Sequence, residues 1–362
     1  MSLPHMTNTF CIGGTRISTS GRHVLDHPHL SNMRTLYLIF SHEHQQQLAR
    51  LVRTIRLLSP NALTAIHHDP SKEALNPSLF PSAQGLHVIP DAVRGEWGDF
   101  SLVEQYLHSF RWCARNLDFD WLVTLTGLTY PIAQLQAFED QLENSEFDAF
   151  VYHFNALDPT HWPRGTGVTR YLFAYFKLPR NPYYYKVPAR IRAALGYIRA
   201  QFNTHQPVLR IVPMARGAPT RLGIRRVRRP FDNTFVICGG RQMLNLSRPA
   251  LERLLKYVDS NPRYLAYAKR TLIPDESFFT SIVANDADLK VCNDALRYIK
   301  WPKDRQHAAS GATITSEELN EVFKSRAPFA LKFDSRVDAT ALDRVDAHLG
   351  LSPGVAADVE PS

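Results

Sequence analysis

Short apolar runs and segments of helical periodicity alternate through the first third of the chain. Residues 35–40 form a strand-like run, and apolar residues between 48 and 58 recur at helical spacing. Residues 61–66 and 88–90 predict two further short strands, and a polar loop follows each strand. Strand, helix, strand in this order is typical of the opening of an α/β nucleotide-binding sheet.

The same alternation continues to the end of the chain. Residues 101–116 predict a long helix with one apolar face, and residues 121–126 predict a buried strand that ends in a glycine turn at 127–131. Further strands are expected at 147–151, 235–238 and 297–299, and further helices from 136, near 187–202, from 247 and at 316–324. We therefore expect one α/β domain over 34–350, a flexible extension at 1–33 and a loose tail at 351–362.

Composition restricts the class of protein. No run of about 18 apolar residues occurs, so no membrane-spanning helix is expected. The N-terminus lacks the basic-then-apolar order of a signal peptide. Cys11, Cys113, Cys238 and Cys292 are widely spaced and form no CxxC pair, which favours free thiols over disulfides or a zinc site. A cytoplasmic protein, peripheral on the inner membrane face if it binds lipid, is the simplest expectation.

The net charge of +8 is concentrated in one segment. No Asp or Glu occurs between Asp158 and Asp232, and we expect residues 159–231 to form a basic insert that faces the acceptor or a membrane. Its cations are Arg164, Arg170, Lys177, Arg180, Lys186, Arg190, Arg192, Arg199, Arg210, Arg216, Arg221, Arg225, Arg226, Arg228 and Arg229. A phosphate-bearing lipid carrier, an anionic membrane or an acidic glycan would suit it, and a solvated face with structural arginine pairs is the alternative. Nucleic acid is not expected, because no nucleic-acid-binding fold signature appears.

Two adjacent carboxylates, Asp275 and Glu276, follow Pro274 and lead into an apolar run that is compatible with a helix. Proline and acidic residues suit a helix start, and a carboxylate held there can serve as a general base. The alternative is a plain capping pair.

Two other groups could bind a metal, and we expect neither to do so. Asp118 and Asp120 form an Asp-x-Asp pair, but they precede their strand, whereas ligand-binding loops lie at the carboxyl ends of strands. His42, His44, His67 and His68 have no spacing that requires a metal, and unliganded loop histidines are commoner.

Six segments occur in the order and spacing of one known family. They are the polar turn at 40–42, His-His-Asp-Pro-Ser-Lys at 67–72, Trp-Gly-Asp-Phe-Ser-Leu-Val at 97–103, Asp-Phe-Asp-Trp and Leu-Thr-Gly-Leu-Thr-Tyr-Pro within 118–131, Pro-Asp-Glu-Ser-Phe-Phe-Thr at 274–280, and Phe-Ala-Leu-Lys-Phe-Asp at 329–334. Taken together they resemble the core-2/I-branching glycosyltransferase family, which also contains the peptide O-xylosyltransferases. The resemblance extends from about residue 33 to about residue 349.

The resemblance implies a GT-A fold, a Rossmann-like mixed β-sheet flanked by helices. It also implies inverting, metal-independent transfer of a sugar from a UDP-sugar to a glycan hydroxyl, with no cofactor. Glu276 matches the catalytic base, and Lys332 matches the cation that neutralises the leaving diphosphate; Arg305 or Arg326 is the candidate second cation. The remaining expected donor-binding residues are His42, Asp69, Trp97, Gly98, Thr126 and Gly127, and the expected acceptor-binding residues are Arg170, Arg241 and Asp275.

The chain departs from the family pattern at two places. Thr129 replaces the usual Asp of the Gly-x-Asp-Tyr-Pro motif, and the segment around Gln242 and Met243 lacks the usual serine and aromatic residue. The donor stays open among UDP-N-acetylglucosamine, UDP-xylose, UDP-glucose and UDP-glucuronate, of which the first two are favoured. A lipid-linked glycan of surface polysaccharide synthesis is the expected acceptor. The alternative function is a catalytically lapsed module that binds anionic glycan or membrane.

Overall fold

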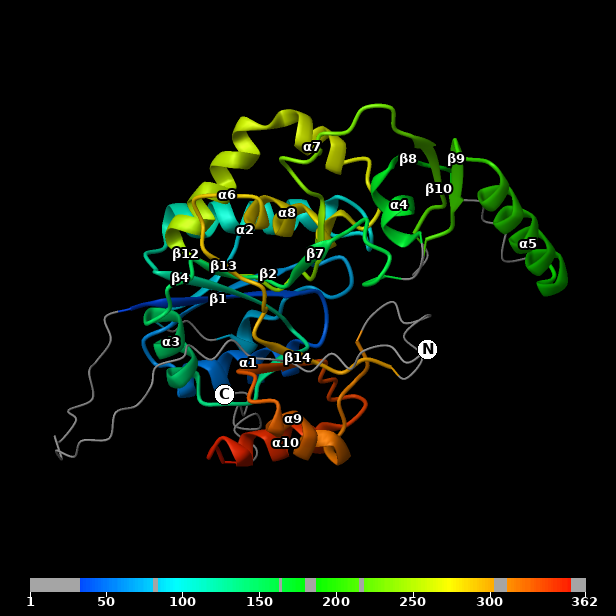
Figure 1. The fold of residues 1–362 in the computed structure, drawn as a ribbon. Coiled ribbons are helices and arrows are strands. Elements are labelled where there is room, and N and C mark those ends of the chain that lie inside the picture. Colours follow the sequence, from blue (N-terminus) through cyan, green and yellow to red (C-terminus); the bar gives the residue numbers. More distant parts are fainter. Residues whose placement is uncertain are drawn as a thin grey trace.

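A seven-stranded mixed sheet forms the centre of the molecule (Figure 1). The computed structural model describes residues 33–80, 84–162, 165–179, 187–214, 218–302 and 311–352. In spatial order the strands of this sheet are β13 (Val291–Cys292), β6 (Ala149–Phe150), β12 (Asn245–Ser247), β4 (Trp121–Thr126), β1 (Thr35–Ser41), β2 (Leu63–His68) and β3 (Leu86–Val88).

Four adjacent strands of this sheet, β4, β1, β2 and β3, are parallel, so their carboxyl ends meet at one edge. Strand β12 is antiparallel to both of its neighbours, which makes the sheet mixed. The register pairs Phe40 with His67 and with Thr126, so the last residues of three strands lie side by side. At this edge three of the predicted donor-binding residues, His42, Asp69 and Gly127, follow β1, β2 and β4.

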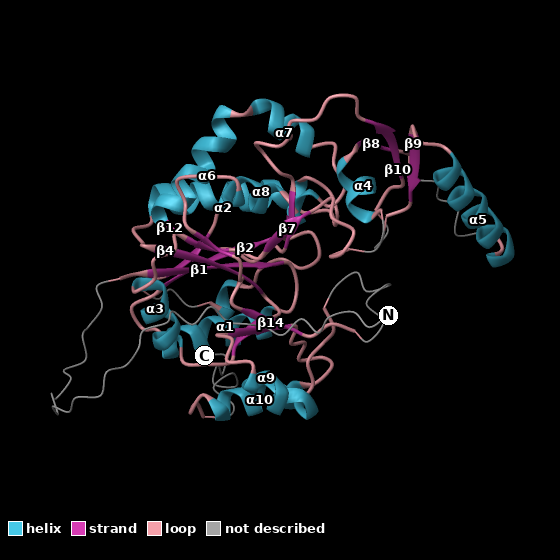
Figure 2. Cartoon of the chain, viewed as in Figure 1, coloured by secondary structure: helices cyan, strands magenta, loops and turns pink. Residues whose placement is uncertain are grey.

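Period-two alternation along β1 divides the core into two layers. Tyr37 and Ile39 pack into one apolar cluster, and Leu36, Leu38 and Phe40 pack into another on the opposite face. Figure 2 shows helices on both sides of the sheet. The first cluster contains residues of α1 (Gln45–Leu58), α3 (Leu135–Glu143), α9 (Leu319–Lys324) and α10 (Ala339–His348); the second contains residues of α2 (Ser101–Asn116), α6 (Arg248–Ser260), α7 (Pro262–Ala268) and α8 (Phe278–Ala284).

Three smaller sheets surround the central one. Strand β15 (Phe329–Leu331) lies between β14 (Arg297–Ile299) and β5 (Thr129–Pro131), and β11 (Cys238–Gly240) pairs with β7 (His153–Asn155). The third sheet, β8 (Phe173–Lys177), β10 (Arg221–Arg225) and β9 (Leu209–Val212), falls within the basic interval. That interval also contains α4 (Thr166–Tyr171) and α5 (Ala189–His205), which extends away from the body of the molecule (Figure 1).

The predicted α/β class with a Rossmann-like mixed sheet is confirmed, with small shifts in individual elements. Strand β2 continues through His68, because its pairing with β1 extends to Ser41. The predicted strand at 235–238 lies instead at β11, and the strand at 147–151 is shortened to β6. Short 3-10 turns, η1 (Pro77–Leu79), η3 (Pro274–Glu276) and η4 (Ser316–Glu318), complete the described elements.

Several expectations fall on residues outside the described ranges. These are most of the extension at 1–33, including Cys11, most of the tail at 351–362, and Arg305. Cys113, Cys238 and Cys292 are buried and are not paired in disulfides, as expected. Within the described ranges, no helix is long and apolar enough to cross a membrane.

Candidate active site

One loop joins the carboxyl end of β2 to the carboxylate turn. The Asp69 carboxylate accepts hydrogen bonds from the backbone N–H of Gly95 (2.6 Å) and of Ser71 (2.9 Å). Further along the same loop, Gly98 adopts φ 72°, and its carbonyl accepts the N–H of Ile273 at 3.1 Å. Ile273 immediately precedes η3, so the predicted donor residues Asp69 and Gly98 are tied to the turn that carries Glu276.

Glycine suits position 98 for two reasons. The positive φ is strained for other residues, which is the main reason, and a Cβ there would in addition require the flexible end of the Met214 side chain, 2.6 Å away, to shift. Trp97, the neighbouring predicted donor residue, is half-buried. Asp69 is buried and holds the loop in place, with its two carboxylate oxygens occupied by loop donors.

Glu276 lies in η3 and forms an ion pair with Arg170. The Arg170 Nη1 atom lies 2.5 Å from Glu276 Oε2, and the Glu276 side chain is 32% exposed, so it is held firmly but remains accessible. The Arg170 guanidinium also lies 4.6 Å from the centroid of the Trp162 ring. Burial lowers the pKa of Arg170, but attraction to Glu276 more than offsets this and leaves the pKa above its usual value. Arg170, predicted to contact the acceptor, is thus brought directly to the predicted base.

Asp275, which precedes Glu276 in the chain, is buried. The amide of Gln242 donates to Asp275 Oδ2, and Oδ1 has no hydrogen-bond partner among the described residues. Burial, together with the adjacent charge of Glu276, raises the pKa of Asp275 to about 7. The two carboxylates therefore have different environments: Glu276 is accessible and paired with a cation, and Asp275 is buried and tends to hold a proton.

Gln242 is a site residue that the sequence did not predict. The backbone carbonyl oxygen of Gln242 accepts hydrogen bonds from Tyr106 Oη (3.0 Å) and from Thr124 Oγ1 (3.2 Å), which fixes the residue between α2 and β4. The sequence shows that this segment departs from the family pattern, but no sequence pattern near residue 242 predicts its contact with Asp275.

The turn after β4 is joined to the segment around Lys332. Gln47 Nε2 donates to the carbonyl oxygens of Gly127 (3.1 Å) and Phe333 (2.9 Å). Thr129 is buried, and its hydroxyl lies 3.0 Å from that of Thr126. The residue that replaces the family's Asp thus binds its own turn.

The other predicted residues lie around this region. His42 follows β1 with a half-exposed side chain 3.2 Å from Glu43, and burial followed by repulsion from Lys72 lowers its pKa. The Arg241 guanidinium stacks over Tyr152 at 4.7 Å and Trp301 at 5.5 Å. Arg326, the alternative second cation, precedes β15, whereas Lys332 follows it, so these two residues lie at opposite ends of that strand.

Several of the candidate metal ligands have other partners. Asp120 Oδ2 accepts the backbone N–H of Arg34 at 2.7 Å, at the amino end of β4. His68 Nδ1 lies 2.7 Å from Ser41 Oγ, and burial lowers the pKa of His67 to about 4. No group of three or more His, Cys, Asp or Glu residues in the described ranges is arranged to hold a metal ion.

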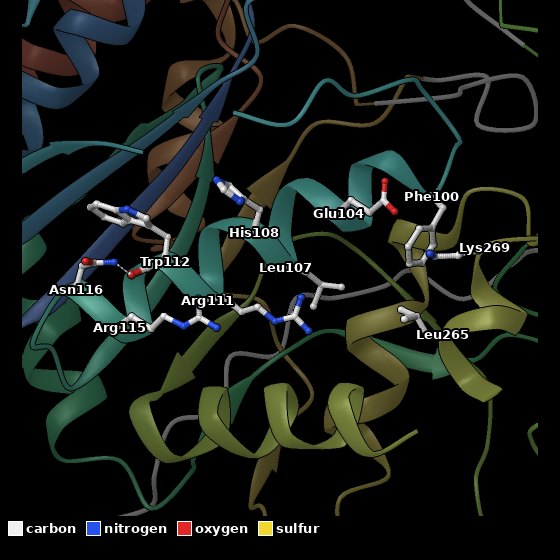
Figure 3. Close-up of a pocket in the computed structure, with 10 residues that line it drawn as sticks. All are labelled: Phe100, Glu104, Leu107, His108, Arg111, Trp112, Arg115, Asn116, Leu265 and Lys269. Carbon is white, nitrogen blue, oxygen red and sulfur yellow. Dashed lines mark hydrogen bonds between the residues drawn. The ribbon is translucent and has the colours of Figure 1, made fainter. Parts of the chain in front are cut away.

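A surface pocket of about 390 Å³ lies along α2 (Figure 3). Arg111, Arg115 and Lys269 are among the side chains that line it, and none of the predicted site residues does.

Comparisons with known proteins give one family match. Residues 201–323 match the family model described as "Branch: Core-2/I-Branching enzyme", which confirms the resemblance over that segment, including the carboxylate turn. No curated protein matches the chain.

Two solved structures were also compared. One is the galactosyltransferase LgtC in complex with donor and acceptor sugar analogues; it is 9% identical, covers 87% of this chain and 95% of its own, and has a TM-score of 0.30. The other is a hypothetical transferase from Thermus thermophilus, 11% identical, covering 66% of this chain and 77% of its own, with a TM-score of 0.23.

Proposed function

We propose that this chain, which carries the core-2/I-branching match, is an inverting GT-A glycosyltransferase that moves a sugar from a UDP-sugar to a glycan hydroxyl. UDP-N-acetylglucosamine and UDP-xylose are the first candidates for the donor, and a lipid-linked glycan is the first candidate for the acceptor. The observation that carries the proposal is the environment of Glu276. This carboxylate is accessible and is held by Arg170, and its turn is hydrogen-bonded to the loop that contacts Asp69 at the carboxyl end of β2.

In this reaction Glu276 takes the proton of the acceptor hydroxyl as the acceptor oxygen bonds to the anomeric carbon. The bond from that carbon to the β-phosphate oxygen breaks, and its electron pair leaves with UDP. Lys332, which follows β15 near the Gly127 turn, neutralises the charge that develops on the diphosphate. No metal is needed for these steps, and the engagement of Asp120 with Arg34 supports a role for the Asp-x-Asp pair in the fold.

The test measures UDP release from each candidate donor, with and without EDTA, for the wild type and Glu276→Gln. We expect turnover that EDTA does not affect and a loss of about 100-fold or more in the variant, the usual contribution of a general base. UDP binding should be unchanged, because Glu276 is proposed to contact the acceptor proton and not the nucleotide.

Glu252→Gln is the matched control. Glu252 also forms an ion pair with an arginine, Arg248, at 2.7 Å, but it lies on the exposed side of α6. Full activity in Glu276→Gln would remove the base assignment, and a strict requirement for a divalent metal would remove the role of Lys332. UDP binding without turnover of any donor, even with lipid-linked acceptors, would instead favour the lapsed binding module.

A further inference from the structure

Helix α5 has 17 residues and none of them is buried. It lies at the outer end of the β8–β10–β9 sheet, apart from the central layers (Figure 1). Isolated helices of this length are marginally stable in water, and most helices in proteins are held by packing of an apolar face. A helix of this kind therefore gains stability from whatever covers it.

One side of α5 is apolar and open to solvent. The exposed Tyr197 lies elsewhere on α5, but four other exposed apolar residues are spaced by four, three and four positions, so they lie within an arc of about 60° on the helix surface. They are Ile191 (51% exposed), Leu195 (48%), Ile198 (62%) and Phe202 (38%). A continuous apolar stripe on an otherwise uncovered helix is typical of a contact surface.

The side of α5 that meets the sheet is different and polar. The Asn203 side chain accepts the N–H of Ile211 and donates to the carbonyl of the same residue, both at 2.9 Å, which fastens the helix to β9. Asn203 lies about 100° around the helix from Phe202, which is the next residue in the chain. The attachment to β9 therefore leaves the apolar stripe directed elsewhere.

The charge around the stripe selects its partner. Helix α5 contains Arg190, Arg192 and Arg199 and no acidic residue, within an interval that has fifteen cations and no Asp or Glu. Two copies of such a surface repel each other. An apolar stripe flanked by arginines instead matches the boundary of an anionic bilayer, where apolar side chains enter the acyl region and cations meet the headgroups.

We infer that α5 docks on the surface of an anionic lipid bilayer, with the stripe of Ile191, Leu195, Ile198 and Phe202 inserted at the headgroup level. The stripe is narrow, so apolar burial and the arginines are both required for binding. The inference deepens the proposed function, because docking would bring the proposed transferase to a lipid-linked acceptor. Only this biological role of docking rests on the proposed function. Docking itself requires no catalysis.

The experiment is co-sedimentation of the full chain with vesicles of phosphatidylcholine alone and of phosphatidylcholine mixed with phosphatidylglycerol. We expect binding to the mixed vesicles only, weakened by added salt. Ile198→Glu should weaken binding about tenfold or more, because it removes an apolar side chain that the bilayer would bury and adds a negative charge that anionic headgroups repel. Arg190→Glu should weaken binding about fivefold or more, since each basic residue near such a surface contributes about that factor.

Val337→Glu is the matched control, because Val337 is 62% exposed, as Ile198 is, but precedes α10 on the other side of the central sheet. Glutamate is a good helix former, so Ile198→Glu should keep α5 folded, which circular dichroism checks. Absence of wild-type binding to mixed vesicles, or equal binding of Ile198→Glu and Val337→Glu, would overturn the inference. So would a dimer in analytical ultracentrifugation that Ile198→Glu dissociates, because a second copy would then cover the stripe.

The inference and the proposed function can fail separately. UDP release with a glycan acceptor that lacks lipid should be unchanged in Ile198→Glu, and vesicle binding should be unchanged in Glu276→Gln. A wild-type chain that binds the mixed vesicles but turns over no donor would contradict only the proposed function.

Discussion

Replacing Asp275 with asparagine is expected to change how the stability of the fold depends on pH. In the folded protein, burial and then the charge of Glu276 raise the pKa of the Asp275 carboxyl from 3.8 to about 7. Between these two values the folded state holds a proton that the unfolded state has released. The free energy of unfolding therefore falls as pH rises from about 4 to about 7. Above that range the ionised, buried Asp275 carboxylate destabilises the fold by its full amount.

The size of this effect follows from the shift. A difference of about 3 pKa units corresponds to about 4 kcal/mol, of which about 2–3 kcal/mol is lost between about pH 5 and about pH 8. Asparagine does not titrate, but its amide nitrogen would replace the unpartnered Oδ1 and leave a buried donor without an acceptor, at a cost of about 1–3 kcal/mol. Near pH 8 the wild-type penalty exceeds this cost, so the variant should be more stable than the wild type, and this advantage should shrink by about 2–3 kcal/mol towards pH 5.

Urea unfolding of both proteins across this pH range is the assay, with the exposed carboxylate variant Asp259→Asn as a control. Glu276→Gln should reduce the pH dependence without abolishing it, because burial is the larger cause of the shift. Parallel stability curves for Asp275→Asn and the wild type would refute the reasoning, since they would mean that Asp275 does not hold a proton in the folded state.

Three further substitutions test the supports of the site. Arg221→Met should lower the free energy of unfolding by about 3 kcal/mol in urea unfolding, because it breaks an ion pair whose arginine is buried. The more exposed Arg253→Met should cost much less, and equal costs would contradict this. Ser247→Ala should cost about 1 kcal/mol in the same assay, because Ser247 caps α6, and no change would show the cap to be unimportant. Arg170→Met should lower kcat about 100-fold with little change in the donor KM, whereas Arg170→Lys should retain part of kcat; an unchanged kcat in Arg170→Met would mean that Glu276 needs no positioning.

Elements with one strong period could be predicted from the sequence. The helix at 101–116 has the bounds of α2, because its apolar residues recur on one face. The strand at 35–40 differs from β1 by one residue, because its apolar run is nearly continuous. The sheet of β8, β10 and β9 was not predicted. Its strands alternate apolar residues with arginine, lysine and glycine, and β8 and β10 are separated by more than forty residues that include α5.

The candidate site shows the same limit. The position of Glu276 after a proline could be read locally, as could the glycine turn at 127. The partnership of Glu276 with Arg170 spans 106 positions and that of Asp275 with Gln242 spans 33, and neither has a local pattern. These contacts depend on how α4 and the segment after β11 pack around η3, which residue spacing does not specify.

Two arginines connect the basic interval to the carboxylate turn by separate routes. Arg170 at the end of α4 binds Glu276 directly, and Arg221 of β10 binds Glu96 and Asp99 in the loop whose Gly98 carbonyl holds Ile273. Helix α5 is attached to β9, and β10 separates β9 from β8. Among the described residues, α5 forms no ion pair or hydrogen bond with either arginine. A change on the exposed stripe of α5 should therefore alter where the proposed transferase acts and leave its chemistry intact, whereas a change at Arg221 should disturb the loop, the turn and the proposed base together.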